Sequence, residues 1–419
     1  MQEILLSTVD FGSNKISASL GKGKEDEFDI IGTTCVSSRG IKKGLIEDEE
    51  SCQEAFKEVV EKLAKKTAED IKNIYVGISC NNLRITEGTG KIKLSYGKIR
   101  GKDIKKAIGR AKSQVNLLDG EEIVDVTINY YIVDEKIVYD DNVVGWIGET
   151  FGINVSIIIG KTEELQKFKD IVVNSGYEFK GFIVNALACR NIFLQGRSSM
   201  GVKVLVDIGA ETSDIAIFRN GVLKYIDYVP LGGDNITRDL SICAKLGISE
   251  AENIKKIIST NYYSLSINKE DEDIMNVGTS SISKSLFYEV VKARLEEILS
   301  YVNKTIKNTS FCEGMCSIII YGSGITYYEN ISELVKDNID FKVTIADNSY
   351  LQMKDLSNLS SLAMLKEVVD RLSLINTEVS EVHAKDIIDQ EKECIDEIDF
   401  EEESSGVISK IKNFFHKLF

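Results

Sequence analysis

The strand-turn-strand pattern that opens this chain recurs near its middle. Residues 9–16, VDFGSNKI, align with residues 206–215, VDIGAETSDI, if the second turn is taken to be longer. Each copy is followed by further strands and then a helix, so each begins a β-β-β-α unit. A duplicated unit of this kind predicts a two-lobed α/β fold with a cleft between the paired turns.

The segment between the two copies changes in pattern from about residue 84 to residue 160. Its apolar spacing predicts a strand at 92–94 and a helix at 102–114. Three further strands are predicted at 123–133, 136–139 and 154–159. We therefore expect a small α+β insertion in the first lobe. Beyond the second copy, the apolar spacing favours helices at 235–258 and 283–306, a strand at 317–321 and a last helix at 359–371.

The composition narrows the class of protein. A chain of 419 residues is too long for one compact core, and its 43% hydrophobic and 28% charged residues are typical of a soluble globular protein. A formal net charge of −15 argues against a nucleic-acid-binding surface. The eight scattered cysteines are expected to be reduced thiols of a cytosolic protein. No apolar run reaches the ~20 residues that a membrane-spanning helix needs.

Charge is distributed unevenly at the C-terminal end. Residues 376–405 contain twelve acidic residues and two lysines, and we expect this stretch to be a flexible linker. Residues 406–419 contain three lysines and no acidic residue. At 100° per residue, the apolar side chains of 407–419 occupy an arc of about 140°, and a helix of roughly 20 Å is too short to span a bilayer. This pattern predicts a helix that lies in a membrane interface, although an amphipathic helix docked on the protein's own body is the alternative.

The residues expected to contact the membrane fall into two groups. The apolar side chains would enter the interface, and the lysines would face anionic head groups. These residues are Val407, Ile408, Ile411, Phe414, Phe415, Leu418 and Phe419, with Lys410, Lys412 and Lys417.

Three glycine-containing turns suggest how the cleft is used. A strand that ends in Asp-x-Gly lets a phosphate approach the backbone closely, and the aspartate can hold Mg²⁺ directly or through water. Asp10 and Asp207 occupy this position in the two copies. A third turn, Gly322-Ser323-Gly324, follows an apolar strand. Three such turns favour a phosphate-binding cleft over ordinary acidic hairpins.

The three turns resemble the phosphate-1, phosphate-2 and adenosine motifs of the actin-like ATPase superfamily. Within that superfamily the chain is similar to the FtsA family of bacterial cell-division proteins. Residues 38–44, SRGIKKG, resemble a segment of that family, and residues 84–160 resemble the domain that it carries in place of an actin subdomain. The likeness runs from about Leu5 to Arg371 and returns in the terminal amphipathic helix.

The resemblance implies a set of nucleotide contacts. ATP and Mg²⁺ would lie in the cleft, with Asp10 and Asp207 facing the metal. The remaining contacts would come from Gly12, Ser13 and Lys15 in one lobe, Gly209, Thr212 and Asp214 in the other, and Gly322, Ser323, Gly324 and Arg294 around the adenosine. The second turn has Ala210 and Glu211 where glycines are usual, so we expect any ATP hydrolysis to be slow.

The resemblance also implies a division into parts. Residues 1–83 and 161–200 would form subdomain 1A, 84–160 the inserted 1C domain of SHS2 type, 201–234 and 311–375 subdomain 2A, 235–310 subdomain 2B, 376–405 the linker and 406–419 the membrane helix. Each lobe core would have the ribonuclease-H-like topology of the superfamily.

The function implied is that of a cell-division adaptor. Such a protein binds ATP, assembles with itself and tethers the tubulin-like protein FtsZ, with other division proteins, to the inner face of the cytoplasmic membrane at the division site. Arg294 would meet the acidic C-terminal tail of FtsZ. Two alternatives remain open: an ATPase or phosphotransferase on the same fold, and a scaffold similar to the pilus-assembly ATPases.

Overall fold

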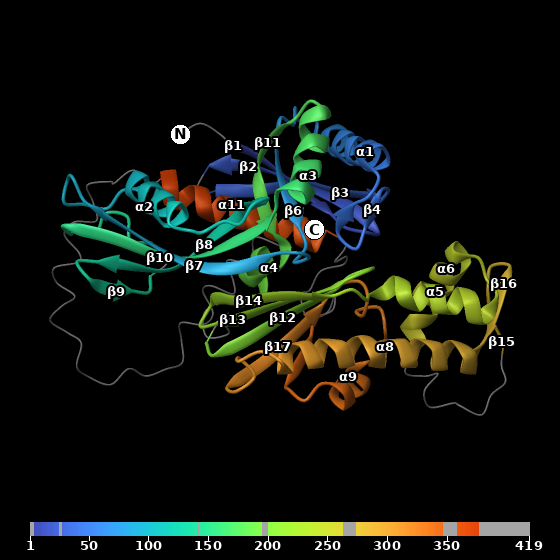
Figure 1. Ribbon diagram of the computed structural model, residues 1–419. Helices are drawn as coiled ribbons and strands as arrows, with labels where there is room; N and C mark the ends of the chain where they lie inside the picture. Colours follow the sequence, from blue (N-terminus) through green and yellow to red (C-terminus); the bar gives the residue numbers. More distant parts are fainter. Residues whose placement is uncertain are drawn as a thin grey trace.

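The computed structural model describes residues 4–24, 27–140, 142–194, 200–262, 274–346 and 358–376 (Figure 1). The predicted linker, apart from Asn376, and the predicted membrane helix lie outside the described residues. Among the described residues, no helix is both long and apolar enough to cross a bilayer.

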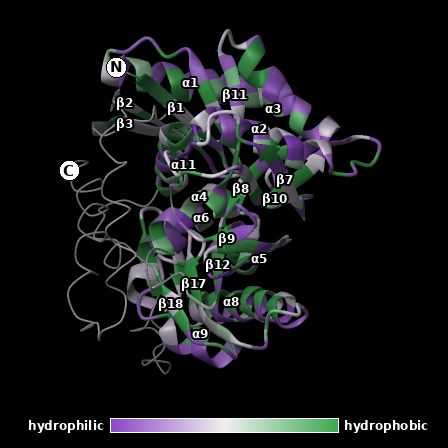
Figure 2. Ribbon diagram, turned by 90° about the vertical axis from the view of Figure 1, so that its left-hand side faces the viewer, coloured by the Kyte–Doolittle hydropathy of each residue, from purple (hydrophilic) through white to green (hydrophobic). Residues whose placement is uncertain are grey.

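The first lobe is a five-stranded mixed sheet covered by helices on both faces. The strand order is β11-β6-β1-β2-β3, with bounds Ile4–Phe11 for β1, Lys15–Lys24 for β2, Glu27–Ser37 for β3, Asn73–Ile78 for β6 and Glu178–Val184 for β11. Figure 1 shows one face covered by α1 (Glu49–Thr67) and α3 (Thr162–Asn174), and the other by α4 (Asn185–Phe193) and α11 (Leu359–Asn376). In Figure 2 the outer helices α1 and α3 carry both hydrophobic and hydrophilic residues, as expected for helices with one solvated face.

The second lobe repeats this sheet. Its strand order is β14-β13-β12-β17-β18, with bounds Val202–Ile208 for β12, Ser213–Arg219 for β13, Val222–Val229 for β14, Met315–Tyr321 for β17 and Val343–Ile345 for β18. In both sheets the first strand pairs antiparallel with the second and parallel with the strand on its other side. The duplication predicted from the sequence is therefore confirmed.

Further helices and a hairpin complete the second lobe. They are α5 (Gly233–Ala244), α6 (Ile248–Ile258), a short 3-10 turn η2 (Ser259–Asn261), the hairpin β15 (Ile274–Val277) and β16 (Ser280–Ser283), and α8 (Lys284–Lys307). Lys245 adopts a left-handed conformation with φ 55° and separates α5 from α6. After the third glycine turn, the next helix is α9 (Ser332–Asn338).

The two Asp-x-Gly turns have the same length, so the expectation that the second is longer is wrong. Phe11 pairs with Ile16 in the first sheet, and Ile208 pairs with Ser213 in the second. The alignment by sequence matched Ile16 to an isoleucine two residues too far along. Strand pairing, which fixes the faces of both strands, sets the true correspondence. Asp214 is therefore the counterpart of Ser17.

The insertion is a separate four-stranded sheet with one helix on its face. The strand order is β7-β10-β8-β9, with bounds Arg84–Lys93 for β7, Glu121–Val133 for β8, Lys136–Val138 for β9 and Thr150–Lys161 for β10. Helix α2 (Gly101–Ser113) buries Ile104 and Ala107 against this sheet. A Cβ on Gly90 of β7 would lie 1.9 Å from the carbonyl oxygen of Ala107, so glycine permits this close helix-strand contact.

The last helix lies in the first lobe, which corrects the assignment of residues 311–375 to the second. Helix α11 contributes Leu362, Met364 and Leu365 to the core of the first lobe. The Thr8 hydroxyl donates to the carbonyl oxygen of Ser361 at 2.7 Å. The chain therefore crosses back after β18, a long-range packing preference that local apolar spacing does not encode.

Candidate functional site

The two lobes place their Asp-x-Gly turns at the edges of a common cleft. Asp10 and Asp207 are the penultimate residues of β1 and β12. Asp10 is buried and accepts a hydrogen bond from Asn185 Nδ2 at 2.7 Å. Burial raises the pKa of Asp10, while the hydrogen bond from Asn185 and the nearby charge of Lys15 lower it in part.

Asp214 brings a third carboxylate to the same place. Its Oδ2 atom accepts the backbone N–H of Cys80, from the first lobe, at 2.8 Å, and its buried Oδ1 atom has no hydrogen-bond partner. Burial and the charge of Asp10 raise the pKa of Asp214 to about 7. The pKa of Asp207 is raised well above its usual range by burial and by the charges of Asp214 and Asp10. Three carboxylates thus repel one another in the cleft, an arrangement that a bound cation would relieve.

The third glycine turn packs directly on the second. The N–H of Gly324 donates to the carbonyl oxygen of Ile208 at 2.7 Å. A Cβ on Gly324 would lie 2.4 Å from the carbonyl oxygen of Gly209, and Gly322 adopts φ 97°. Side chains at these two glycines would separate the turns or strain the backbone. The glycines that define the predicted adenosine turn are therefore required by the fold.

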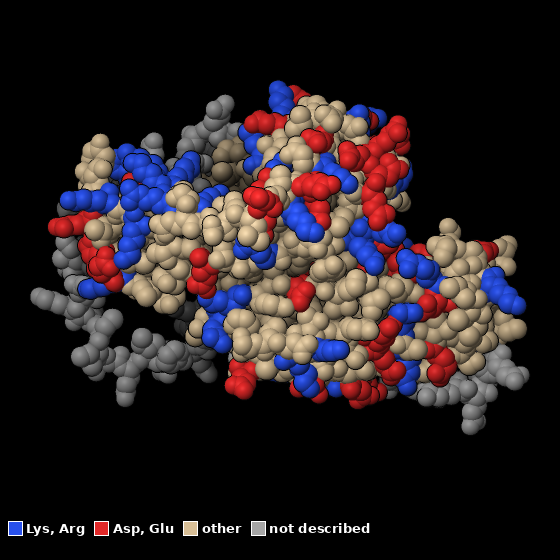
Figure 3. Space-filling view, in the orientation of Figure 1, with Lys and Arg blue, Asp and Glu red and all other residues tan. Residues whose placement is uncertain are grey.

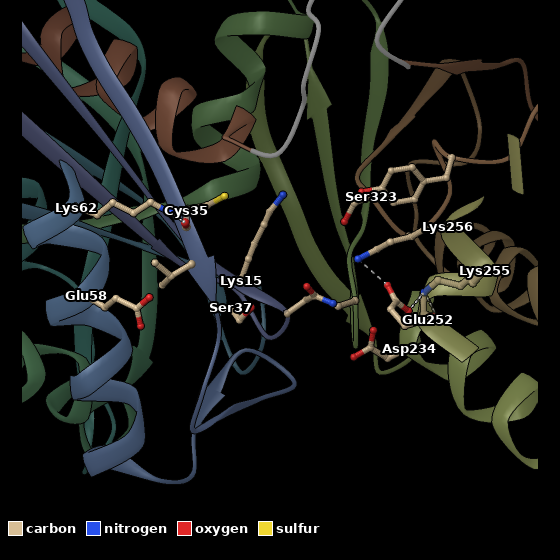
Figure 4. A pocket seen from close by; sticks show the side chains of 16 residues that line it. Lys15, Cys35, Ser37, Glu58, Lys62, Asp234, Glu252, Lys255, Lys256 and Ser323 are labelled. Atoms are coloured by element: carbon tan, nitrogen blue, oxygen red, sulfur yellow. Dashed lines mark hydrogen bonds and ion pairs between the residues drawn. The ribbon is translucent and has the colours of Figure 1, made fainter. Parts of the chain in front are cut away.

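A cavity of about 500 Å³ lies between the lobes beside these turns (Figure 4). This volume is within the roughly 300–1,000 Å³ typical of small-molecule sites. Figure 4 shows Lys15 extending into the cavity from the first lobe. The lining residues are Asn14, Lys15, Cys35, Val36, Ser37, Glu58 and Lys62 on one side, and Ala210, Gly233, Asp234, Glu252, Lys255, Lys256, Ser323, Gly324 and Tyr327 on the other.

The wall formed by α6 was not predicted. Lys255 is buried and donates to the carbonyl oxygen of Gly233 at 3.0 Å and to Thr237 Oγ1 at 2.7 Å. Glu252 lies 2.7 Å from Lys255 Nζ and 3.1 Å from Lys256 Nζ. These charges give the cavity a polar wall opposite Lys15. In the sequence, Glu252, Lys255 and Lys256 have the pattern of a solvated helix face. The only sequence signal near this wall is the pair Gly232-Gly233, at the start of α5.

Glu211 contacts the first lobe and is not among the residues that line the cavity. A small hairpin of the first lobe, β4 (Ile41–Lys42) and β5 (Leu45–Ile46), has its tip next to both Asp-x-Gly turns. The backbone N–H of Lys43 donates to Glu211 Oε2 at 2.6 Å, and that of Gly44 donates to Ser13 Oγ at 3.1 Å. The Glu211 carboxylate therefore has a backbone partner in the other lobe.

We predict that Glu211→Ala raises amide hydrogen exchange of the hairpin at residues 41–46 by about tenfold. A hydrogen bond to a charged acceptor contributes about 1.5 kcal/mol, and ~1.4 kcal/mol corresponds to a factor of ten. Exchange measured by mass spectrometry on the full chain tests this. Glu211→Gln is the matched control, because its amide oxygen can still accept the Lys43 N–H. Equal exchange in the wild type and Glu211→Ala would contradict the contact.

Arg294 lies on α8 and does not line the cavity. Its guanidinium forms an ion pair with Asp239 of α5, at 2.7 Å from Nε and 2.6 Å from Nη2, and a second one with Glu297. The other predicted site residues lie at the turns: Lys15, Ser323 and Gly324 line the cavity, while Asp10, Asp207 and Asp214 form the carboxylate cluster.

The donor set fits a phosphate-bound Mg²⁺ better than a metal held by protein alone. Within the described residues, no group of three His, Cys, Asp or Glu is arranged to hold a metal ion by itself. Mg²⁺ bound to a nucleotide takes one or two carboxylates and completes its shell with phosphate oxygens and water. Asp10 and Asp207 supply such carboxylates, and the unpartnered Asp214 Oδ1 can accept a hydrogen bond from a metal-bound water.

Comparison with known sequences finds one family repeatedly. The family model described as "Cell division protein FtsA" matches residues 204–365. The chain is 25% identical to the cell division protein FtsA of Bacillus subtilis, over 86% of this chain and 83% of that protein. It is 26% identical to FtsA of Buchnera aphidicola, over 89% and 91%, and 25% identical to FtsA of Escherichia coli K12, over 72% of each.

Comparison with solved structures supports the fold. The type IV pilus biogenesis complex of PilM and PilN has a TM-score of 0.55 at 11% identity, covering 88% of this chain and 96% of that one. MreB5 of Spiroplasma citri bound to ADP has a TM-score of 0.51 at 13% identity, covering 89% and 99%. At these identities the likeness shows the actin-like fold alone, and it agrees with the duplicated sheets.

Proposed function

The chain belongs to the FtsA family of cell division proteins, and on this premise we propose that it is a nucleotide-binding adaptor that tethers FtsZ to the membrane. ATP with Mg²⁺ would bind between the lobes and set their closure and self-assembly. The acidic residues 376–405 would form a flexible linker to the helix at 406–419. The protein would then act on the cytoplasmic side of the membrane, at the division site.

One observation carries the nucleotide part of this proposal. Two Asp-x-Gly turns, from lobes far apart in sequence, meet a third glycine turn beside a polar cavity of about 500 Å³. The three repelling carboxylates lie where a cation would lower their mutual repulsion. Packing alone does not explain the buried Asp214 Oδ1 atom, which has no hydrogen-bond partner.

Different residues would contact different parts of the nucleotide. Gly12 and Gly209 let phosphates approach the backbone, and Lys15 contributes positive charge from the first lobe. Mg²⁺ would neutralise phosphate charge, with Asp10 and Asp207 facing it. Ser13 now accepts the Gly44 N–H, so its hydroxyl proton is available as a donor. Thr212 would complete the second phosphate turn, and Ser323 would border the adenosine.

Arg294 remains the proposed contact for the acidic tail of FtsZ. Its guanidinium is already paired with Asp239 and Glu297, so an acidic peptide would have to displace at least one of them. This exchange favours a modest, salt-sensitive interaction. A low affinity for one tail suits assembly on a membrane, where many weak contacts add up.

Pelleting with vesicles of anionic lipid tests the membrane part. We expect full-length protein to pellet with the vesicles and a chain that lacks residues 406–419 to remain in the supernatant, because the deletion removes seven apolar side chains and three lysines. ATP should increase pelleting of the full-length chain if nucleotide promotes self-assembly. Unchanged pelleting of the truncated chain would overturn the tether, and turnover unaffected by the truncation, without vesicle binding, would indicate a soluble ATPase.

A further inference from the structure

The exposed face of helix α2 carries five cations and no exposed acidic side chain. The acidic residue of this helix, Asp103, is buried and accepts the backbone N–H of Arg100 at 3.1 Å. Figure 3 shows Lys and Arg side chains gathered over α2, on a chain whose net charge is −15. We name these exposed cations the α2 basic face: Lys102, Lys105, Lys106, Arg110 and Lys112.

Most of the charge on this face is uncompensated. In the part of the chain that the structure describes, no ion pair joins Lys105, Lys106 or Lys112 to an acidic residue. At one edge Tyr96, 66% exposed, lies under two cations, with Arg100 at 4.2 Å and Lys102 at 5.0 Å from the ring centroid. Like charges at helical spacing repel one another, so an anionic partner would stabilise this surface.

The described chain ends beside the α2 basic face. Near its start α11 contacts the first lobe, where Ser361 accepts from Thr8, and farther along Arg371 contacts Asp125 of the insertion at 2.6 Å. The C-terminal end of α11 therefore lies on the insertion side. Helices α11 and α2 are in contact, and Figure 1 shows them side by side. The residues that follow Asn376 thus start next to the basic face.

We propose that the acidic segment 377–405 docks on the α2 basic face of the same molecule. The stretch from Asn376 to Ser405 has twelve acidic residues and two lysines, so its charge is opposite to that of the face. Because it is attached beside the face, the local concentration of the segment is on the order of millimolar, and weak ion pairs suffice for docking.

Docking would shorten the free tether that precedes residues 406–419. The reach of the terminal helix would then increase when salt or a competing polyanion releases the acidic segment. This consequence rests on the proposed membrane function, whereas the docking itself depends only on charge and attachment.

Zero-length carbodiimide cross-linking of the full chain tests where the segment lies. We expect cross-links within single molecules from Lys105, Lys106 or Lys112 to carboxylates of 377–405 at about 50 mM salt, falling at least about fivefold at about 500 mM. Cross-links spread over exposed lysines elsewhere, or found only in dimers, would overturn the proposal.

A cleavage assay tests whether the face protects the segment. The variant Lys105→Gln/Lys106→Gln/Lys112→Gln should be cut within 377–405 by a glutamate-specific protease at least about fivefold faster at low salt. The control Lys57→Gln/Lys65→Gln/Lys304→Gln removes the same charge from other exposed positions and should match the wild type. Equal cleavage of the two variants would contradict docking.

The same two variants separate docking from a direct membrane contact. If the α2 variant lost binding to phosphatidylglycerol vesicles while its cleavage rate was unchanged, the face would be a membrane surface and the proposal wrong. Vesicle binding that depends on residues 406–419 tests the proposed function separately, so either idea can fail without the other.

Discussion

Arg371→Met should lower the free energy of unfolding by about 3–5 kcal/mol. The Arg371 guanidinium bridges Asp125 of the insertion, at 2.6 Å, and Glu367 of its own helix, at 2.7 Å. The side chains of both carboxylates are nearly inaccessible, with 3% and 4% exposed. Methionine fills similar space but leaves the buried Asp125 without its cation and Glu367 with Arg190 alone, at 3.8 Å. Chemical denaturation, followed by circular dichroism, measures the loss.

The pH dependence of this effect has a definite sign. Arg371 and Arg190 hold the pKa of Glu367 at about 2 against burial, below the 4.5 of the unfolded chain. The stabilisation by this group is therefore complete above pH 4.5 and is lost as the pH falls toward 2. The difference between wild type and Arg371→Met should shrink over that range. Lys307→Met, which breaks an exposed pair with Asp340, should cost much less than Arg371→Met, because water screens that pair. Equal losses in the two variants would contradict the buried network.

Asp207→Asn should weaken binding of Mg²⁺ with ATP at least about 100-fold, or ~2.7 kcal/mol, yet stabilise the ligand-free protein. Asparagine keeps the shape of the side chain but removes the charge that we propose faces the metal. It also removes the carboxylate whose pKa is raised by burial and by the charges of Asp214 and Asp10. Calorimetry of nucleotide binding and thermal unfolding of the ligand-free protein measure the two effects.

The stability gain should grow with pH. Burial and the charges of Asp214 and Asp10 raise the folded pKa of Asp207 well above the unfolded 3.8, so the ligand-free protein loses stability as the pH rises above 3.8. The stability gain of Asp207→Asn should therefore be smallest near pH 4 and increase as the pH rises. Glu58→Gln is the control, because Glu58 lines the cavity beside Arg39 but lies outside the carboxylate cluster. A loss of stability in Asp207→Asn, with unchanged nucleotide affinity, would contradict the assigned site.

Local patterns predicted much of the fold because they reflect local physics. The strand ends that carry Asp10 and Asp207, and the glycines that follow them, are specified by short segments, and both lie where the sequence indicated. The insertion was recognisable because its apolar spacing differs from that of the flanking segments. The second Asp-x-Gly turn was predicted to be too long because Ile16 was matched to Ile215. The correct register of the strands is visible only from their pairing.

Features that depend on distant contacts were not predictable in the same way. Helix α11 reads as an apolar helix that either lobe could bury, and Ser361 meets Thr8 only after the chain crosses back. The charged residues of α6 have the sequence pattern of a solvated surface. Only the folded structure shows that they line a cavity opposite Lys15. Glu211 looked like an obstacle to phosphate, and its Lys43 partner comes from a hairpin too short to leave a clear pattern.

Recruitment of FtsZ to anionic vesicles is the most direct test of the tether. With ATP present, FtsZ should pellet with vesicles when the full-length chain is added. FtsZ should stay in solution with the chain that lacks residues 406–419, and also when FtsZ lacks its C-terminal tail. FtsZ that pellets equally well with the truncated chain, or that never pellets although the full-length chain binds the vesicles, would contradict the proposed tether.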